Sequence, residues 1–322
     1  MLIIFIHFLI IFNKQYKITI IIIIIMYINI NNNNNNNNNI ININNNNNFV
    51  IPQYQIPKIQ YILIIIVFLL IYQISYGFTI LYIFQTYQSY LIKIPISLLF
   101  YFFLIMSIIC YISTIIIDNK IDYEYYNSLP IDQCKNLSYC SICQSYRGLR
   151  SHHCRMCNVC ISVMDHHCPW IVNCIGEKNL KSFFLFIIYS FFTCLICSIF
   201  TVRKFIDFVN YNSYYNSGFS QNFIMNIIGN YERNLPLFTF LLAVFFTLSF
   251  GIFIYIQYSN LKIGITSIER MIYYNNLKEC PDYNENVIEN IEKVFKNNYF
   301  LPFYNNNEED DNKEEFKYIK LN

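Results

Sequence analysis

The residues with the clearest chemical potential lie in a short stretch rich in cysteine and histidine. Seven of the twelve cysteines and four of the five histidines fall within residues 140–174. A Cys-x-x-Cys turn brings two thiolates to one metal ion, and zinc prefers four tetrahedral cysteine or histidine ligands. Two such turns are present, Cys140 with Cys143 and Cys154 with Cys157. The stretch therefore predicts zinc binding.

Each turn needs two further ligands, and spacing alone does not say which residues complete which site. Two zinc ions would use eight ligands, whereas a single four-cysteine site built from the two turns fits the spacing equally well. Both arrangements are compatible with the sequence. The remaining candidate ligands are Cys160, Cys168, Cys174, His152, His153, His166 and His167.

One cysteine of the stretch is a candidate nucleophile. If six cysteines and two histidines bind two ions, one thiol is left over, and Cys168 stands beside His166, His167 and Asp165. The thiolate is the reactive form of cysteine, an imidazole accepts its proton near neutral pH, and a carboxylate orients that imidazole. Cys168 could instead be a zinc ligand like its neighbours, and the spacing favours neither role.

The elements that carry this stretch are predicted from the apolar composition. The chain is 55% hydrophobic and 13% charged, with a mean hydropathy of +0.32. Ordinary soluble domains carry roughly 25% charged residues, so an ordinary cytosolic enzyme is excluded. A helix needs about 20 apolar residues to cross a bilayer. We expect an all-α membrane protein with four transmembrane helices and the zinc-binding loop between the second and third, because four runs contain no charged residue: 61–84, 94–117, 182–202 and 237–259.

The distribution of lysine and arginine predicts which side of the membrane the loop faces. Seven lysine or arginine residues lie in residues 118–181, and eight lie in the segment after the last apolar run. The loop between the first two runs has only Lys93, and the loop between the last two has Arg203, Lys204 and Arg233. Cytoplasmic loops carry an excess of these residues. Both termini and the cysteine-rich loop are therefore expected in the cytosol, where thiols stay reduced. The net charge of +2 gives no reason to expect a nucleic-acid partner.

The two ends of the chain carry no candidate chemistry. Residues 1–12 and 18–30 are apolar but too short to span a bilayer, and residues 31–48 are almost entirely asparagine. No signal peptide is expected, and the asparagine tract is expected to be a flexible linker. The expected segments are an N-terminal extension at 1–57, two transmembrane helices at 58–117, the zinc domain at 118–181, two further transmembrane helices at 182–259 and a cytosolic tail at 260–322.

The sequence around Cys168 resembles the DHHC family of protein S-acyltransferases, also called palmitoyltransferases. Residues 165–170 read Asp-His-His-Cys-Pro-Trp. The four apolar runs with this loop between the second and third also resemble the family's architecture. One departure is Gly148, which follows Arg147 where proline is usual, and it removes no ligand. Further positions of the family pattern are met by Cys140, Cys143, His153, Cys154, Cys157, Cys160, Asn173, Cys174, Gly176, Asn179 and Phe183.

The resemblance implies two interleaved structural zinc sites and a free nucleophile. Cys168 would accept the acyl group, with His166 as its base and Asp165 orienting that base. The implied ligands are Cys140, Cys143, His153 and Cys160 for one ion, and Cys154, Cys157, His167 and Cys174 for the other.

Two segments after the last apolar run also resemble family motifs. Residues 266–269, Thr-Ser-Ile-Glu, are similar to a Thr-Thr-x-Glu motif, and Ser267 retains a hydroxyl, so its hydrogen bond is expected to persist. Asn290, with Val294-Phe295 and Leu301-Pro302, resembles a C-terminal element of the family.

The activity implied by the resemblance is transfer of a long-chain acyl group from acyl-CoA, such as palmitoyl-CoA, to protein cysteine thiols through an acyl-cysteine intermediate. The implied partners are the lipid bilayer and membrane-associated substrate proteins with cytosolic cysteines, and no accessory subunit is indicated. The implied location is the endomembrane system, in Golgi, endoplasmic reticulum or plasma membrane, with the active site facing the cytosol. The alternative is a catalytically silent, membrane-anchored zinc scaffold, which predicts a cluster without a spare nucleophile.

Overall fold

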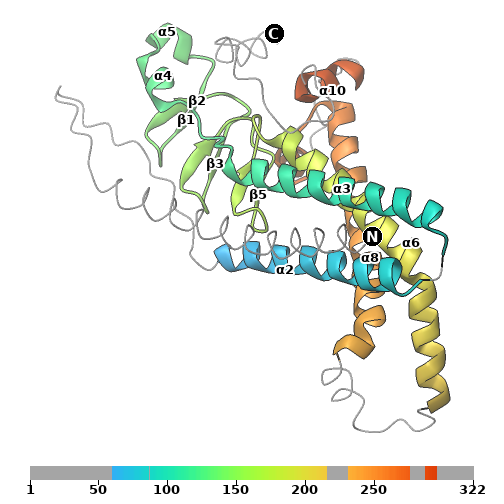
Figure 1. The fold of residues 1–322 in the computed structure, drawn as a ribbon. Coiled ribbons are helices and arrows are strands. Elements are labelled where there is room, and N and C mark those ends of the chain that lie inside the picture. Colours follow the sequence, from blue (N-terminus) through green and yellow to red (C-terminus); the bar gives the residue numbers. More distant parts are fainter. Residues whose placement is uncertain (1–59, 87, 216–230, 276–286, 296–322) are drawn as a thin grey trace, which may run out of the picture.

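The computed structural model describes residues 60–86, 88–215, 231–275 and 287–295. Long helices dominate it, and a region of short strands follows the second of them at one end of the helix assembly (Figure 1). The expectations for the N-terminal extension, the asparagine tract, Leu301-Pro302 and the rest of the tail beyond residue 295 fall outside the described residues.

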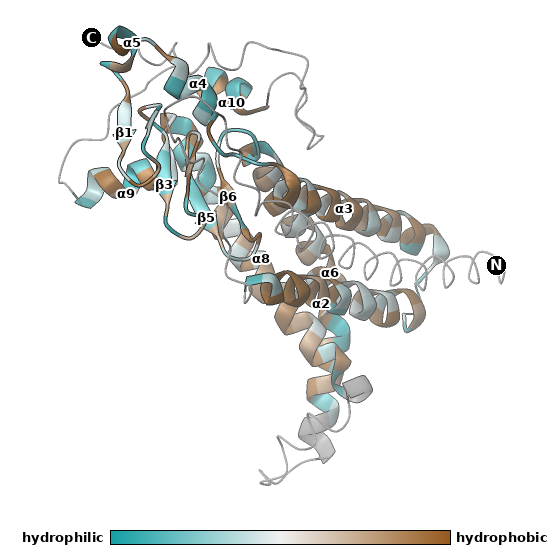
Figure 2. Cartoon of the chain, turned by 90° about the vertical axis from the view of Figure 1, so that its left-hand side faces the viewer, coloured by the Kyte–Doolittle hydropathy of each residue, from teal (hydrophilic) through white to brown (hydrophobic). Residues whose placement is uncertain are grey.

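Four described helices are long and apolar enough to cross a membrane, which confirms the expected architecture and fits a multi-pass membrane protein. Hydrophobic residues dominate the long helices (Figure 2), and among their apolar side chains Leu98, Leu248 and Ile252 are each more than 60% exposed. Such faces suit contact with lipid. The helices are α2 (Tyr61–Phe78), which continues as the π-helix η2 (Thr79–Phe84), α3 (Tyr90–Ile116), α6 (Leu180–Tyr215) and α8 (Tyr231–Ile263).

Three of these helices extend past the charge-free runs, and all three extensions include basic residues. Helix α3 begins before Lys93, whose ammonium donates hydrogen bonds to the carbonyl oxygens of Ile83 and Thr86. Carbonyls at a helix C-terminus lack partners within the helix and favour a cation. Helix α6 has 36 residues and continues beyond Arg203. At 1.5 Å per residue it is about 54 Å long, so its end can extend beyond a hydrocarbon core about 30 Å thick.

Three antiparallel hairpins form the region between α3 and α6. A residue with left-handed backbone lies in each connecting turn, namely Gln144, Asn158 and Val172. Strands of three residues bury too little surface to be stable alone. The pairs are β1 (Ser138–Cys140) with β2 (Ser145–Arg147), β3 (His152–Cys154) with β4 (Val159–Ile161), and β5 (His166–Cys168) with β6 (Asn173–Ile175). Short helices flank them, α4 (Tyr123–Ser128) and α5 (Ile131–Cys134) before the strands, and α9 (Ser267–Asn275) and α10 (Val287–Phe295) after α8.

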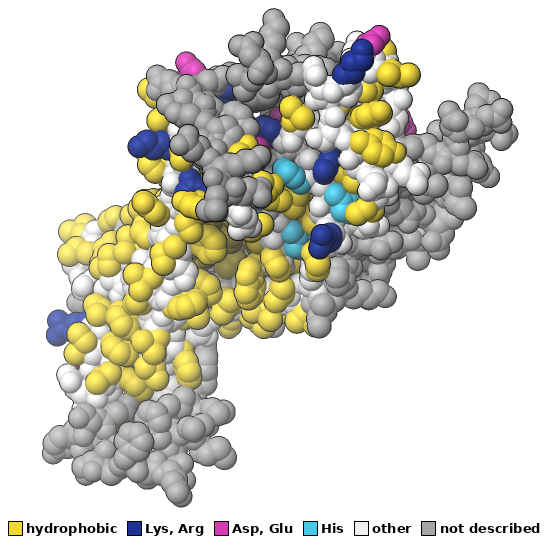
Figure 3. All heavy atoms as spheres, turned by 180° about the vertical axis from the view of Figure 1, so that it is seen from behind, with side chains coloured by type: hydrophobic (Ala, Val, Ile, Leu, Met, Phe, Trp, Pro, Cys, Tyr) yellow, Lys and Arg dark blue, Asp and Glu magenta, His cyan; other side chains and the backbone are white. Residues whose placement is uncertain are grey.

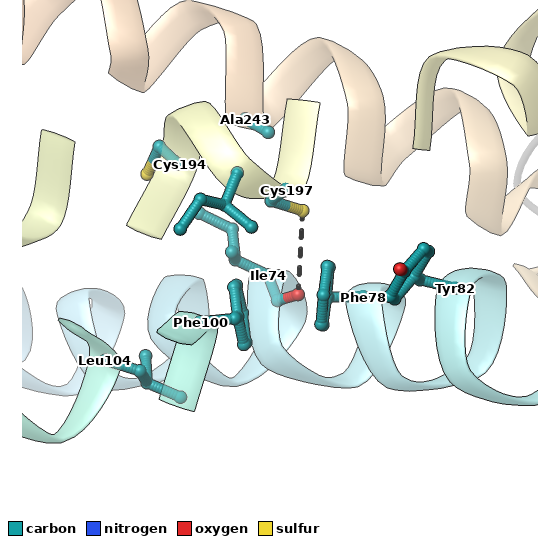
Figure 4. Close-up of a cluster of buried hydrophobic side chains, with 9 residues drawn as sticks. Ile74, Phe78, Tyr82, Phe100, Leu104, Cys194, Cys197 and Ala243 are labelled. Carbon is teal, nitrogen blue, oxygen red and sulfur yellow. Dashed lines mark hydrogen bonds between the residues drawn. The ribbon is translucent and has the colours of Figure 1, made fainter. Parts of the chain in front are cut away.

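The long helices meet in an apolar cluster that holds the assembly together. Helix α6 packs against both α3 and α8, and the rings of Phe78 and Phe100 stack with their centroids 3.9 Å apart (Figure 4). A Cβ atom on Gly77 would lie 2.1 Å from Oγ1 of Thr239. Only glycine therefore lets α2 and α8 approach this closely, as small residues do between membrane helices.

Asparagine side chains tie the third hairpin to the end of α3. Nδ2 of Asn173 donates to the carbonyl oxygens of Thr114 and Ile117, at 3.1 and 2.8 Å. Nδ2 of Asn179 donates to the same Thr114 oxygen at 3.2 Å. Because the last carbonyls of a helix have no partner within it, these bonds fix β5 and β6 at the end of a membrane helix.

Candidate functional site

The first candidate metal site gathers side chains from the first two hairpins. The ligand atoms of Cys140, Cys143, His153 and Cys160 all lie within 4.8 Å of one another. Nδ1 of His153 is 3.2 Å from Sγ of Cys143, and the β3–β4 register places His153 opposite Cys160. The hydroxyl of Tyr123 donates to Sγ of Cys143 at 3.4 Å and accepts from the backbone nitrogen of Cys160 at 2.7 Å. Tyr123 thus holds two members of the cluster in place.

The second candidate metal site repeats this arrangement one hairpin further along. The ligand atoms of Cys154, Cys157, His167 and Cys174 also lie within 4.8 Å of one another. Nδ1 of His167 is 3.3 Å from Sγ of Cys157, and the two sulfurs of Cys157 and Cys174 are 3.4 Å apart. The β5–β6 register sets His167 opposite Cys174.

The two clusters interleave because side chains alternate along a strand. His153 faces the first cluster, and the next residue of β3, Cys154, faces the second. The two Cys-x-x-Cys turns therefore lie in different clusters, and the single four-cysteine site does not occur. The eight residues fall into the two groups that the family resemblance implies.

The donor chemistry of both clusters fits zinc. Three thiols and one imidazole around a single point match a structural zinc site, in which the protein supplies all four ligands. All eight side chains are cysteines and histidines that are buried or half-buried within the hairpins, although these hairpins have little core of their own. Metal binding would therefore supply folding energy to this region.

Cys168 lies outside both metal groups among the described residues. Alternation along β5 turns His166 and Cys168 to the face opposite His167. The thiol is 8% exposed, belongs to an apolar cluster with Tyr111 and Ile171, and hydrogen-bonds to His166. Histidine side chains reach the surface near the junction of the apolar helices and the strand region (Figure 3).

The imidazole of His166 joins the thiol to a buried carboxylate. Its Nδ1 lies 2.7 Å from Oδ2 of Asp165. Burial of the ring opposes its positive charge, but the hydrogen bonds to Asp165 and Cys168 outweigh this effect and raise the pKa of His166 to about 9. Thiol, imidazole and carboxylate thus form a connected chain of three groups.

Asp165 is held by residues that lie about a hundred positions further along the chain. Its carboxylate is 2% exposed and accepts hydrogen bonds from the backbone nitrogen of Ser267 at 2.7 Å, from the Ser267 hydroxyl at 3.1 Å and from Nε2 of Gln257 at 3.2 Å. Burial opposes the ionised form, yet the hydrogen bond with His166 and these donors lower the pKa of Asp165. The hydrogen-bonding role expected of the Ser267 hydroxyl is confirmed.

A second carboxylate fixes the segment that carries Ser267. Glu269 accepts two hydrogen bonds from the guanidinium of Arg150, at 2.7 and 2.8 Å, and one from the backbone nitrogen of Thr266 at 2.7 Å. Burial opposes its charge, but the bond from Arg150 lowers the pKa of Glu269. This bidentate pair links the connection between β2 and β3 to α9 and thereby presents Ser267 to Asp165.

Residues beyond those predicted from the sequence also shape the site. Gln257 contacts Asp165 from within an apolar run, where a polar side chain is itself a signal of function. The hydroxyl of Tyr111 donates to the backbone oxygen of Trp170 at 2.8 Å and so holds the turn after Cys168. Cys134 is buried outside both metal groups. Asn290 is also buried, and its side chain would lie 3.2 Å from a Cβ on Gly264.

Comparison with known proteins agrees with this geometry. Residues 133–274 match the family model described as DHHC palmitoyltransferase. The chain is 29% identical to the probable protein S-acyltransferase 12 of Arabidopsis thaliana, over 67% of this chain and 75% of that one. It is 46% identical to palmitoyltransferase ZDHHC20 of Homo sapiens, over 25% of this chain and only 23% of that one. It is 54% identical to palmitoyltransferase ZDHHC20 of Bos taurus, over 23% of this chain and only 20% of that one. Residues 133–274 of this chain thus carry a domain that matches the DHHC palmitoyltransferase family model, and the relatives with which the chain aligns are named as protein S-acyltransferases and palmitoyltransferases.

Proposed function

We propose that the protein transfers a long-chain acyl group, such as palmitoyl, from acyl-CoA to cysteine thiols of substrate proteins through an acyl-Cys168 intermediate. The observation that carries this proposal is the position of Cys168. Its thiol stands outside both metal clusters and is hydrogen-bonded to His166, which is in turn hydrogen-bonded to Asp165.

In the first half-reaction, His166 accepts the proton of Cys168 and the thiolate attacks the thioester carbonyl of acyl-CoA. A bond forms between the Cys168 sulfur and the acyl carbon, the bond to the CoA sulfur breaks, and the leaving thiolate takes the proton back from His166. Asp165 stabilises this imidazolium, in keeping with the raised pKa of His166. General-base catalysis of this kind contributes typically 10²- to 10⁴-fold in rate.

In the second half-reaction, neutral His166 takes the proton of a substrate thiol. The resulting thiolate attacks the acyl carbon, and Cys168 leaves as a thiolate beside the newly charged imidazole. One thioester is exchanged for another in each half-reaction, so the transfer needs no external source of energy.

The zinc ions would have a structural role, held by Cys140, Cys143, His153 and Cys160 and by Cys154, Cys157, His167 and Cys174. Each would stabilise its hairpins as a closed four-ligand site. We place the strand region in the cytosol from the distribution of lysine and arginine, and the protein in the endomembrane system with membrane-associated proteins as substrates. The proposed segments keep the boundaries 1–57, 58–117, 118–181, 182–259 and 260–322.

The acyl chain would lie among the long helices. Cys168 shares its apolar cluster with Tyr111 of α3 and with Phe183 and Ile187 of α6, so an acyl group on its sulfur would start at the ends of these helices. Burying a methylene contributes about 0.8 kcal/mol, which favours a long chain over a short one.

Incubation of the purified full-length protein with labelled palmitoyl-CoA tests the proposal. We expect covalent label on the chain that hydroxylamine removes, with release of free CoA, because hydroxylamine cleaves thioesters. A chain that binds two zinc ions but takes no such label would overturn the acyltransferase activity and leave the scaffold alternative.

The hydroxyl of Ser267 provides a test of how Asp165 acts. Ser267→Ala removes one hydrogen bond to an ionised, buried carboxylate, which is worth about 1.5–3 kcal/mol, and we expect acyl transfer to slow at least about tenfold. Ser267→Thr retains a hydroxyl and should retain most of the rate. The measurement is the initial rate of CoA release.

A matched control for this pair is Ser249→Ala. Ser249 lies in α8, and its hydroxyl donates to the carbonyl oxygen of Phe245 in its own helix at 2.8 Å. The Ser249→Ala variant should release CoA at the same initial rate as the wild type. Equal rates for Ser267→Ala and the wild type would show that this bond does not support Asp165.

A further inference from the structure

We propose that Gln60, at the start of the first membrane helix, is a positioning residue for the second zinc site. It acts by accepting a hydrogen bond from the ring nitrogen of His167 that faces away from the metal cluster. The inference rests on the second metal site of the proposed function. It is independent of acyl transfer.

The first step is the orientation of the His167 ring. Its Nδ1 lies 3.3 Å from Sγ of Cys157, 3.6 Å from Sγ of Cys174 and 3.7 Å from Sγ of Cys154. Nδ1 is therefore the ring atom that faces the three sulfurs and the metal position. The other nitrogen, Nε2, lies 3.2 Å from Oε1 of Gln60.

The second step is the proton on that ring. A neutral histidine that binds a metal through Nδ1 carries its proton on Nε2, and the partner of this N–H fixes both the tautomer and the ring orientation. An amide oxygen accepts this bond and cannot donate in return. Gln60 therefore favours the one tautomer of His167 that leaves Nδ1 free for the metal.

The third step is the burial and placement of Gln60. Its side chain is only 6% exposed, so its amide oxygen would lack a water partner if His167 moved, and an unsatisfied buried acceptor is costly. Gln60 precedes the first turn of α2 and lies outside the family domain matched at residues 133–274. The first membrane helix thus contributes to a metal site that the hairpins otherwise build alone.

Zinc retention by the purified full-length protein tests this role. The protein is titrated with a chelator and the two zinc ions released are counted. We expect Gln60→Leu to release one of its two ions at a chelator concentration about 10- to 100-fold lower than the wild type, because loss of such a partner typically costs that much in metal affinity. The other ion should be released only after this one, because β3 carries ligands of both clusters and loss of the second ion also weakens the first site.

Three further variants separate positioning from packing. Gln60→Glu supplies a carboxylate oxygen for the same N–H, so it should retain zinc like the wild type. Gln60→Asn is one methylene shorter, so it should retain zinc less well. Gln60→Asn also provides the test if Gln60→Leu does not fold. Gln73→Leu is the matched control, since Gln73 lies on the same helix and donates to Oγ1 of Thr239 at 3.4 Å, far from the cluster. Wild-type retention in both Gln60→Leu and Gln60→Asn would overturn the proposal, as would equal weakening by Gln60→Glu.

These outcomes are distinguishable from failure of the proposed activity. A wild-type chain that binds two zinc ions but transfers no acyl group would still test the role of Gln60 in full. Conversely, normal zinc retention by every Gln60 variant would refute this inference and leave the reaction at Cys168 untouched.

Discussion

Replacing Cys168 by serine is expected to abolish hydroxylamine-sensitive acylation of the protein while leaving two zinc ions per chain. The variant keeps the size of the side chain but removes the thiolate nucleophile, and loss of a nucleophile costs at least about 10³-fold in rate. The measurement combines covalent label from palmitoyl-CoA with elemental analysis of zinc. The second readout matters because the sequence alone also permits Cys168 to be a metal ligand.

The matched control is Cys134→Ser. Cys134 is also buried, at the end of α5, and also lies outside both metal groups, so its variant should keep both the label and the zinc. Loss of zinc in Cys168→Ser would assign Cys168 to a metal site. Undiminished label would mean that another cysteine accepts the acyl group.

Replacing Cys174 by serine is expected to remove the second zinc ion and to unfold the strand region. Structural zinc contributes an apparent binding free energy of about 10–16 kcal/mol in small domains, which is comparable to the whole stability of a typical protein. The sulfur of Cys174 lies 3.4 Å from that of Cys157 within the second cluster. Because β3 carries ligands of both clusters, we expect the first site to weaken as well.

Elemental analysis and limited proteolysis check this expectation. The zinc content should fall from two ions per chain to one or fewer, and the segment between α3 and α6 should become the most rapidly cleaved part of the chain. The same Cys134→Ser control should resist proteolysis like the wild type. Two zinc ions in the Cys174→Ser variant would remove Cys174 from the ligand set.

The apolar runs predicted the number and order of the membrane helices, because the requirement for about 20 apolar residues is local in sequence. The helix ends were less well predicted. Because charged residues were excluded from the predicted spans, the second predicted span begins after Lys93. The ammonium of Lys93 nevertheless fits within α3, since it donates to two carbonyl oxygens at the end of the preceding helix. Similarly, Arg203 lies in α6 because that helix is longer than the hydrocarbon core.

The division of the ligands could not be derived from spacing, because hairpin register decides it. His153 meets Cys160 as a cross-strand neighbour, and His167 meets Cys174 in the same way. The contacts of two glutamines were missed for a different reason. Gln60 lies 107 residues from His167 and Gln257 lies 92 residues from Asp165, and no local pattern reports contacts at such separations.

The pleat of β5 also determines where the chain tolerates insertions and deletions. Adding one residue between His167 and Cys168 would turn the thiol toward the metal, and deleting one there would remove either the ligand or the nucleophile. Changing the length of a connection between hairpins reverses no strand face, but both connections carry residues that shape the site: Arg150 lies between β2 and β3, and Asp165 lies between β4 and β5. Length variation is therefore expected to be absent from the histidine–cysteine triplet and from both of these connections.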